Sequence, residues 1–196
     1  ADAPTLAVAS MPPLEVRRKG DRIEVTGEGF SLSFDKKAGT LASLRSEGVE
    51  LLAQGPRLDV WRAPTDNDGI FREQPRFKCR QWLNKGFDRL EHEVRDVTVK
   101  QVAPQALRIE VHARVCAAGV AEGFDCKYIY AIYGSGDIAI RTHVTPDRGL
   151  PVLPRLGLAL KVRGGFEQFA WFGRGPHENY CDRNHGTAVG RYSGTV

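Results

Sequence analysis

Carboxylates and histidines that lie close together are the residues of this sequence that could perform acid–base chemistry. Hydrolysis of a glycosidic bond usually needs two carboxyl groups, one as acid and the other as nucleophile or base. Glu178 and Asp182 form the most conspicuous pair, but their spacing alone assigns them no role. Pairing of either carboxylate with Arg174 or Arg183 accounts for the same residues structurally, because arginine commonly braces loop carboxylates. Both interpretations stay open here.

The histidines are the other candidates for a catalytic base or a metal ligand. His112 and His143 alternate with charged neighbours along strand-like segments, so we expect both on solvated strand faces. His92 has apolar residues two positions away on either side and is expected to be a satisfied core or edge histidine. His177 and His185 fall in loops, where functional residues concentrate, and remain open as candidates.

The run Asp66-Asn67-Asp68-Gly69 is similar to the middle of a calcium-binding loop, because closely spaced side-chain oxygens can converge on a hard cation. The rest of that motif is absent. When Gly69 is aligned with the glycine of the motif, Pro64 replaces the first aspartate and Pro75 replaces the bidentate glutamate. We therefore predict a local turn held by its own side-chain hydrogen bonds, and no metal site.

Alternation of apolar and polar residues predicts that most of the chain is β-strand. One hairpin is expected around the turn at 27–29, and a second, longer one around Gly134–Asp137. The longest alternating set is Leu107, Ile109, Val111, Ala113 and Val115. A single short helix is expected near 78–85, ended by Gly86 as its C-terminal cap. The fold class is therefore all-β, a large antiparallel sandwich.

Composition indicates one folded domain. The chain has 196 residues, of which 41% are hydrophobic and 27% charged, close to ordinary globular values. Its net charge of +4 comes from interspersed residues of both signs, so we expect no nucleic-acid partner. No apolar run is long enough to span a membrane, so we expect no membrane partner. Residues 1–20 contain several prolines and are predicted to be a linker or N-terminal strap, and the folded domain is predicted to be 21–196.

The chain starts without a methionine, which suggests a segment of a longer polypeptide or a processed form, and we see no signal peptide. Its four cysteines are far apart and include no C-x-x-C pair, which excludes the usual zinc spacing. Free buried thiols are the expected state. A cytoplasmic location is favoured over a periplasmic or secreted one.

Two segments carry a family resemblance: Val60–Gly69, with the sequence VWRAPTDNDG, and Trp171–Arg183, with the sequence WFGRGPHENYCDR. Between them lie Trp82 with Gly86–Asp88 and the stretch 153–158. In order and rough spacing these segments resemble the C-terminal, small-chain domain of family-2 glycoside hydrolase β-galactosidases. The resemblance covers roughly residues 20–196.

This resemblance implies a supersandwich of the galactose-mutarotase type, with 153–158 as a strand and the distal part of the domain lying beyond Val196. It implies a parent enzyme that hydrolyses terminal β-D-galactosides with retention, using two glutamates of a separate upstream barrel. The chain itself would be a non-catalytic accessory domain without a cofactor, and the parent enzyme would use Mg²⁺ or Na⁺ in its other domains. Its expected partners are the barrel and other domains, a β-galactoside, and further copies of the chain.

We expect no catalytic residue in the chain and no metal ligand. The candidate substrate-binding residues are Arg62, Asp66, Asn67, Asp68, His177, Glu178 and Asn179. Ion pairs of Arg62 with Asp66 and of Asp182 with Arg183 would brace loops, which is the structural alternative to direct sugar contact. The alternative function is an independent carbohydrate-binding or mutarotase-like domain, in which His177 and Glu178 would act as acid and base.

Overall fold

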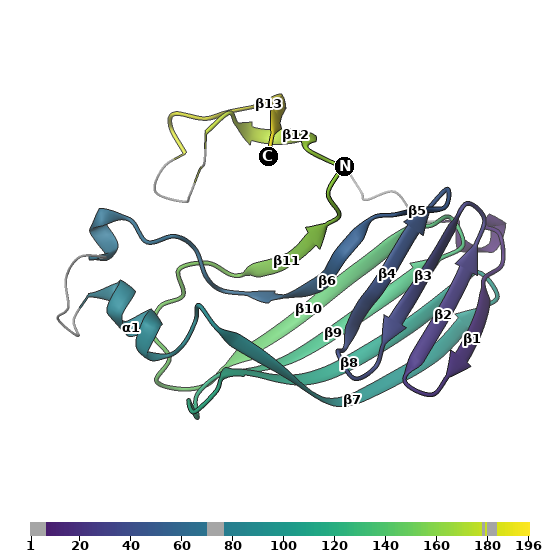
Figure 1. Cartoon of the computed structure of the whole chain (residues 1–196), viewed down its shortest axis with the longest axis horizontal. Coiled ribbons are helices and arrows are strands. Elements are labelled where there is room, and N and C mark those ends of the chain that lie inside the picture. Colours follow the sequence, from purple (N-terminus) through teal and green to yellow (C-terminus); the bar gives the residue numbers. More distant parts are fainter. Residues whose placement is uncertain (1–6, 70–76, 178, 180–183) are drawn as a thin grey trace. The chain divides into compact units, whose positions relative to one another are not determined.

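The structure is a computed structural model that describes residues 7–69, 77–177, 179 and 184–196. The chain divides into two compact units, Ala1–Lys161 and Val162–Val196. Strands joined in antiparallel pairs make up most of the described residues, which confirms the all-β class (Figure 1). No helix in the described part of the chain has the length and apolarity needed to cross a membrane.

The first unit begins with a 3-10 turn, η1 (Val8–Ser10), followed by a five-stranded antiparallel sheet. In spatial order its strands are β1 (Glu15–Lys19), β2 (Arg22–Gly27), β3 (Phe30–Asp35), β4 (Thr40–Ser46) and β5 (Val49–Glu50). The predicted hairpin at 27–29 is confirmed by the pairing of β2 with β3, in which Val25 lies opposite Leu32. The register shifts at Ser33/Phe34, where β3 pairs with β4.

A four-stranded antiparallel sheet forms the other half of this unit. Its strands, in spatial order, are β10 (Ile138–Pro146), β9 (Phe124–Tyr133), β8 (Ala106–Ala117) and β7 (Leu90–Ala103). The predicted hairpin around Gly134–Asp137 is confirmed, because β10 pairs along its whole length with β9, with Tyr130 opposite Ile140. In Figure 1 these strands run in teal and green beneath the purple and blue strands β1–β4.

The core lies between these two sheets. All five residues of the predicted alternating set on β8 are buried, and so are the alternating residues of β9: Phe124, Cys126, Tyr128, Tyr130 and Ile132. Across the gap, the ring of Phe34 on β3 contacts the ring of Tyr130 edge-to-face at 5.1 Å between centroids. The Tyr130 hydroxyl also lies 3.5 Å from the hydroxyl of Thr40. The opposite parity of β8 is polar and includes His112, which is exposed as predicted.

The segment that follows the five-stranded sheet in sequence contains the first motif, Val60–Gly69. Strand β6 (Leu52–Asp59) pairs with β11 (Gly157–Val162), and η2 (Asp66–Asp68) precedes the α-helix α1 (Lys78–Asn84). The helix confirms the prediction for 78–85, and Gly86 follows its cap with a φ of +66°, the left-handed value typical of a C-terminal glycine. Trp82 projects from α1 into the core and is 2% exposed.

The second unit contains the hairpin of β12 (Gln168–Gly175) and β13 (Ala188–Thr195), with Trp171 opposite Tyr192. Large apolar side chains on it are exposed, among them Phe172 at 80%. A two-stranded hairpin is at best marginally stable in water without a covering layer.

Two sequence boundaries differ from expectation. Strand β1 lies inside the segment 1–20 that was predicted to be a linker or strap, and Leu14 before it is buried. Its side chains are mostly exposed because β1 is an edge strand, so it shows no apolar alternation. Within the predicted strand 153–158, β11 begins only at Gly157. The prediction of one domain over 21–196 stays a prediction.

The cysteines agree with expectation where they are described. Cys79, Cys116 and Cys126 are free thiols, and two of them, Cys79 and Cys126, are buried. Burial raises the pKa of the Cys126 thiol to about 11, so this thiol is protonated and unreactive near neutral pH. Cys181 lies outside the described residues.

Candidate functional site

The loop Trp61–Gly69, which joins β6 to the segment before α1, carries four of the candidate residues. Its centre is an ion pair between Arg62 and Asp68. The Arg62 Nη1 lies 2.7 Å from Asp68 Oδ2 and its Nη2 lies 3.3 Å from Oδ1, a fork that matches the planar guanidinium to the carboxylate. Asp68 is only 4% exposed. The pair is therefore largely removed from water.

Thr65 provides two further hydrogen bonds to the Asp68 carboxylate. Its backbone N–H donates to Asp68 Oδ2 at 2.8 Å and its hydroxyl donates to the same oxygen at 3.0 Å. Burial acts to raise the pKa of Asp68, but the bonds from Arg62 and Thr65 outweigh it and hold that pKa below its usual value. This arrangement confirms the predicted turn held by its own side chains, and Gly69 ends it with a φ of +75°.

Arg62 also connects the loop to two other segments. Its guanidinium lies over the Trp82 ring of α1 at 5.3 Å, and its Nε donates to the Pro154 carbonyl at 3.3 Å. The Trp82 Nε1 donates to the Val152 carbonyl at 2.8 Å. Trp61 packs edge-to-face against Trp82, with ring centroids 6.5 Å apart. The loop is thus anchored to the helix and to the stretch before β11.

These contacts divide the predicted loop residues into two kinds. Arg62 and Asp68 are engaged with each other, so the carboxylate that Arg62 pairs with is Asp68 and not the predicted Asp66. Asp66 and Asn67 are exposed at the tip, where their side chains are available to a neighbouring surface. Within the described ranges no group of three or more His, Cys, Asp or Glu residues could hold a metal ion.

The second motif begins on β12 in the other compact unit. The Trp171 Nε1 donates to the Arg174 carbonyl at 3.2 Å, and Arg174 Nη1 donates to the Thr187 carbonyl at 3.1 Å. The Trp171 ring lies between those of Phe169 and Tyr192, at 5.3 and 5.4 Å. These contacts brace the end of the hairpin where the loop joins the two strands, and they leave the Arg174 side chain bound to backbone carbonyls.

His177 and Asn179 follow this strand, and both are exposed. Glu178 lies outside the described residues, as do Asp182 and Arg183, so the proposed pairings of Glu178 and Asp182 with arginine stay predictions. The two motifs belong to different compact units. The structure therefore brings together Arg62, Asp66, Asn67 and Asp68 in one loop, and it describes His177 and Asn179 only within their own hairpin.

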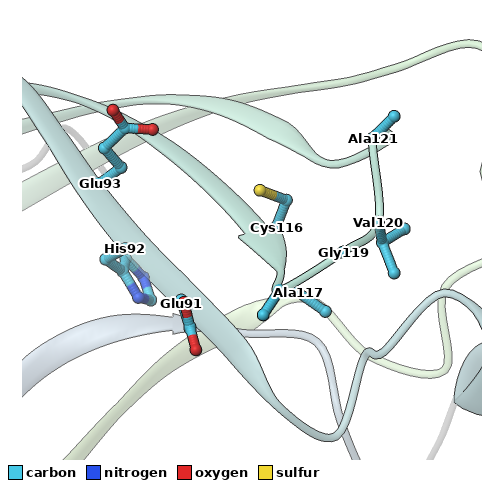
Figure 2. Close-up of a pocket in the computed structure, with 9 residues that line it drawn as sticks. Glu91, His92, Glu93, Cys116, Ala117, Gly119, Val120 and Ala121 are labelled. Carbon is cyan, nitrogen blue, oxygen red and sulfur yellow. The ribbon is translucent and has the colours of Figure 1, made fainter.

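A pocket that the sequence did not indicate lies where β7 meets the end of β8, and Figure 2 shows its lining. Glu93 and Cys116 project from the two strands, and the turn 117–121 forms the opposite wall. Glu91 lies directly opposite Cys116 in the strand register. The volume is about 600 Å³, but the pocket is open to solvent.

This pocket has little of the chemistry expected of a sugar site. Binding pockets for small molecules are usually lined by aromatic and apolar groups with a few convergent polar ones. The described residues around this pocket include two glutamates, a thiol and the imidazole of His92, but no tryptophan, tyrosine, phenylalanine or arginine. Only the strand parity of Glu91 and Glu93 could have predicted that these carboxylates share one exposed face.

Sequence reasoning also missed the role of Trp82. Its indole supports Arg62 from a helix that begins well after the motif, and its ring nitrogen binds a carbonyl 70 positions later. The signal available was the presence of Trp82 twenty positions after Arg62, which is too general to identify the pair.

The fold and its braced loop define an antiparallel all-β domain with a buried arginine–aspartate centre. A family model described as "Beta galactosidase small chain" matches residues 26–196, most of the chain and both compact units. The chain belongs to this family, and it is a small-chain domain of β-galactosidases.

Curated relatives support the assignment. The β-galactosidase of Priestia megaterium is 33% identical over 189 residues, which cover 96% of this chain and 17% of the relative. That of Clostridium acetobutylicum is 32% identical, covering 88% of this chain and 18% of the relative. The Kluyveromyces lactis enzyme is 26% identical, over 87% of this chain and 16% of its own length. The chain thus spans less than a fifth of the length of these relatives.

Proposed function

We propose that this chain is a non-catalytic accessory domain of a β-galactosidase, which packs beside the domain that hydrolyses terminal β-D-galactosides and helps to shape its active site. The family match and the relatives that carry the name support the enzyme class. The small share of each relative that the chain spans supports an accessory role, because most of each relative's length lies outside the matching region. Under this proposal, Mg²⁺ or Na⁺ would be bound by other domains, in a cytoplasmic enzyme.

The observation that carries the proposal is that the Trp61–Gly69 loop contains two kinds of polar residue, a pair that bonds internally and two side chains that are exposed. Arg62 and Asp68 pair with each other, which supports a structural role for both. Their pairing fixes a loop whose tip presents Asp66 and Asn67 to the surroundings. A rigid loop with polar tip residues suits the wall of a site completed by another domain.

Kinetics of a full-length β-galactosidase that carries this chain test the contribution of that tip. We expect the double variant Asp66→Ala, Asn67→Ala to lower kcat/KM about fivefold, roughly the effect of losing one hydrogen bond in the substrate complex. Glu28→Ala, an exposed carboxylate at the turn between β2 and β3, is the matched control and should leave kcat/KM unchanged. Equal kinetics for the double variant and the control would refute a role of the tip in the active site.

An independent sugar-binding or mutarotase-like role is the second candidate, and the exposed side chains of His177 and Asn179 are the feature that favours it. Polarimetry of freshly dissolved galactose distinguishes it from an accessory role, because a mutarotase would accelerate the change in rotation. Calorimetric titration with galactose and lactose tests binding. If the protein neither accelerates the change in rotation nor gives a heat of binding, the second candidate is excluded and only the accessory role remains.

A further inference from the structure

A small cavity lies inside the first unit, between β6 and the inner face of the four-stranded sheet. Its volume is about 10 Å³. Most of its lining is apolar, but three polar side chains reach it: Arg57 from β6, His92 from β7 and Tyr128 from β9. The rings of His92 and Tyr128 are 6.4 Å apart.

All three of these side chains carry a buried atom that lacks a hydrogen bond to another described residue, and in Tyr128 this atom is the hydroxyl oxygen. Both ring nitrogens of His92 and the Nε of Arg57 are inaccessible to solvent and have no hydrogen-bond partner among the described residues. His92 was expected to be a satisfied core or edge histidine, and the described protein groups alone do not satisfy it. Each unsatisfied buried polar group costs about 1–3 kcal/mol, so native proteins nearly always supply a partner.

His92 has the hydrogen-bonding capacity of a neutral ring. Burial, followed by the nearby charge of Arg57, lowers the pKa of His92 to about 4, so one nitrogen is a donor and the other an acceptor at neutral pH. The Arg57 Nε–H is a donor only. A ligand that both donates and accepts is needed to satisfy this set. Figure 2 shows His92 on the side of β7 away from Glu93, so that surface carboxylate is directed elsewhere.

We propose that this cavity is a binding site for one ordered water molecule that accepts a hydrogen bond from Arg57 and bonds to a ring nitrogen of His92. A cavity needs about 10–15 Å³ to hold one water, together with two to four polar partners, and this one meets both conditions. Polyatomic anions such as phosphate exceed this volume. The water would join β6 to the edge strand β7.

NMR of the labelled chain tests the site through cross-relaxation between water and the ring protons of His92 and Tyr128. A buried water should give direct water cross-peaks to these protons, and the exposed ring of His112 provides the background level. We expect His92→Phe to abolish the cross-peaks at Tyr128. Absence of water cross-peaks in the unsubstituted chain would overturn the proposal.

A second variant covers the case in which His92→Phe does not fold. Ala113 lines the cavity and is 4% exposed, so Ala113→Val places additional methyl groups in the space assigned to the water. We expect this variant to lose the water cross-peaks at His92 while the chain stays folded. Cross-peaks that persist unchanged in Ala113→Val would place the water elsewhere and refute the site.

Discussion

At the scale of single residues, the motif Val60–Gly69 suggests a binding site in the sequence, whereas in the structure its side chains hold the loop together. Aspartates and an arginine within eight positions could equally well bind a cation, a sugar or each other. The structure shows the last of these, a fork of Arg62 onto Asp68 together with the two donors of Thr65. The identity of the partner could not be read from spacing, because Asp66 and Asp68 lie four and six positions after Arg62, and the direction that the 3-10 turn gives each side chain decides which one pairs.

Asp68→Ala should lower the free energy of unfolding by about 2–4 kcal/mol, because it leaves Arg62 largely buried without its carboxylate. Asp66→Ala, at the exposed tip of the same turn, should change it by less than about 0.5 kcal/mol. Urea denaturation of the two variants measures both values. Similar losses for the two aspartates would contradict the buried-pair interpretation.

His92 makes stability depend on pH. Its folded pKa of about 4 lies below the ordinary value of 6.5, so the unfolded chain binds the proton more tightly and stability falls as pH decreases from 6.5 toward 4. The expected loss between pH 7 and pH 5 is about 2 kcal/mol. Urea denaturation across this range should show it in the unsubstituted chain and not in His92→Phe.

Protonation of carboxylates lowers stability only at a lower pH, so its effect can be separated from that of His92. Burial alone would raise the pKa of Glu50, but hydrogen bonds from the Ser43 hydroxyl and from the amides of Leu44 and Leu52 lower it to about 2. Glu50 therefore costs stability only as pH falls below about 4.5, its ordinary value. A pH dependence between 7 and 5 that survives in His92→Phe would contradict the assignment to His92.

At the scale of the elements, the sequence predicted strands most accurately where one face of the strand is buried. The alternation on β8 and β9 predicted both strands and their buried parity, because a strand between a core and solvent must alternate. Edge strand β1 buries almost none of its side chains, so its sequence has no apolar alternation from which its pairing with β2 could be predicted. The end of the helix was predicted from Gly86, whose left-handed backbone few other residues adopt.

Gly86→Ala should destabilise the first unit by about 3 kcal/mol, combining the cost of a positive φ with overpacking. A Cβ at this position would lie 2.2 Å from the Cβ of Ala117. Gly119→Ala is the matched control, because Gly119 has a similar φ of +74° but open space around its missing Cβ. Urea denaturation should give about 1 kcal/mol for the control. Equal losses would show that packing against Ala117 contributes nothing.

At the scale of the whole molecule, the chain consists of a well-packed first unit and a small hairpin unit with exposed aromatic and aliphatic side chains. The sequence predicted the family and the all-β class, because long motifs and alternation are local signals. Division into two units depends on contacts between distant segments, which no local pattern records.

Hydrogen exchange should reflect this division. In the isolated chain we expect amides of β8 and β9 to exchange at least ~100-fold more slowly than those of β12 and β13, because a lone hairpin opens with little free-energy cost. Mass spectrometry after deuterium labelling measures both regions in one experiment. Comparable protection of the hairpin and the central strands would contradict the expected difference in stability.

Hydrolysis of a chromogenic β-galactoside by the purified chain is the most direct test of an accessory role. The buried Arg62–Asp68 pair and the sparse chemistry of the pocket at Glu91 and Cys116 predict no turnover above the buffer rate. A full-length β-galactosidase assayed in parallel shows that the substrate is competent. Turnover that follows the chain through successive purification steps would contradict the proposal that it is non-catalytic.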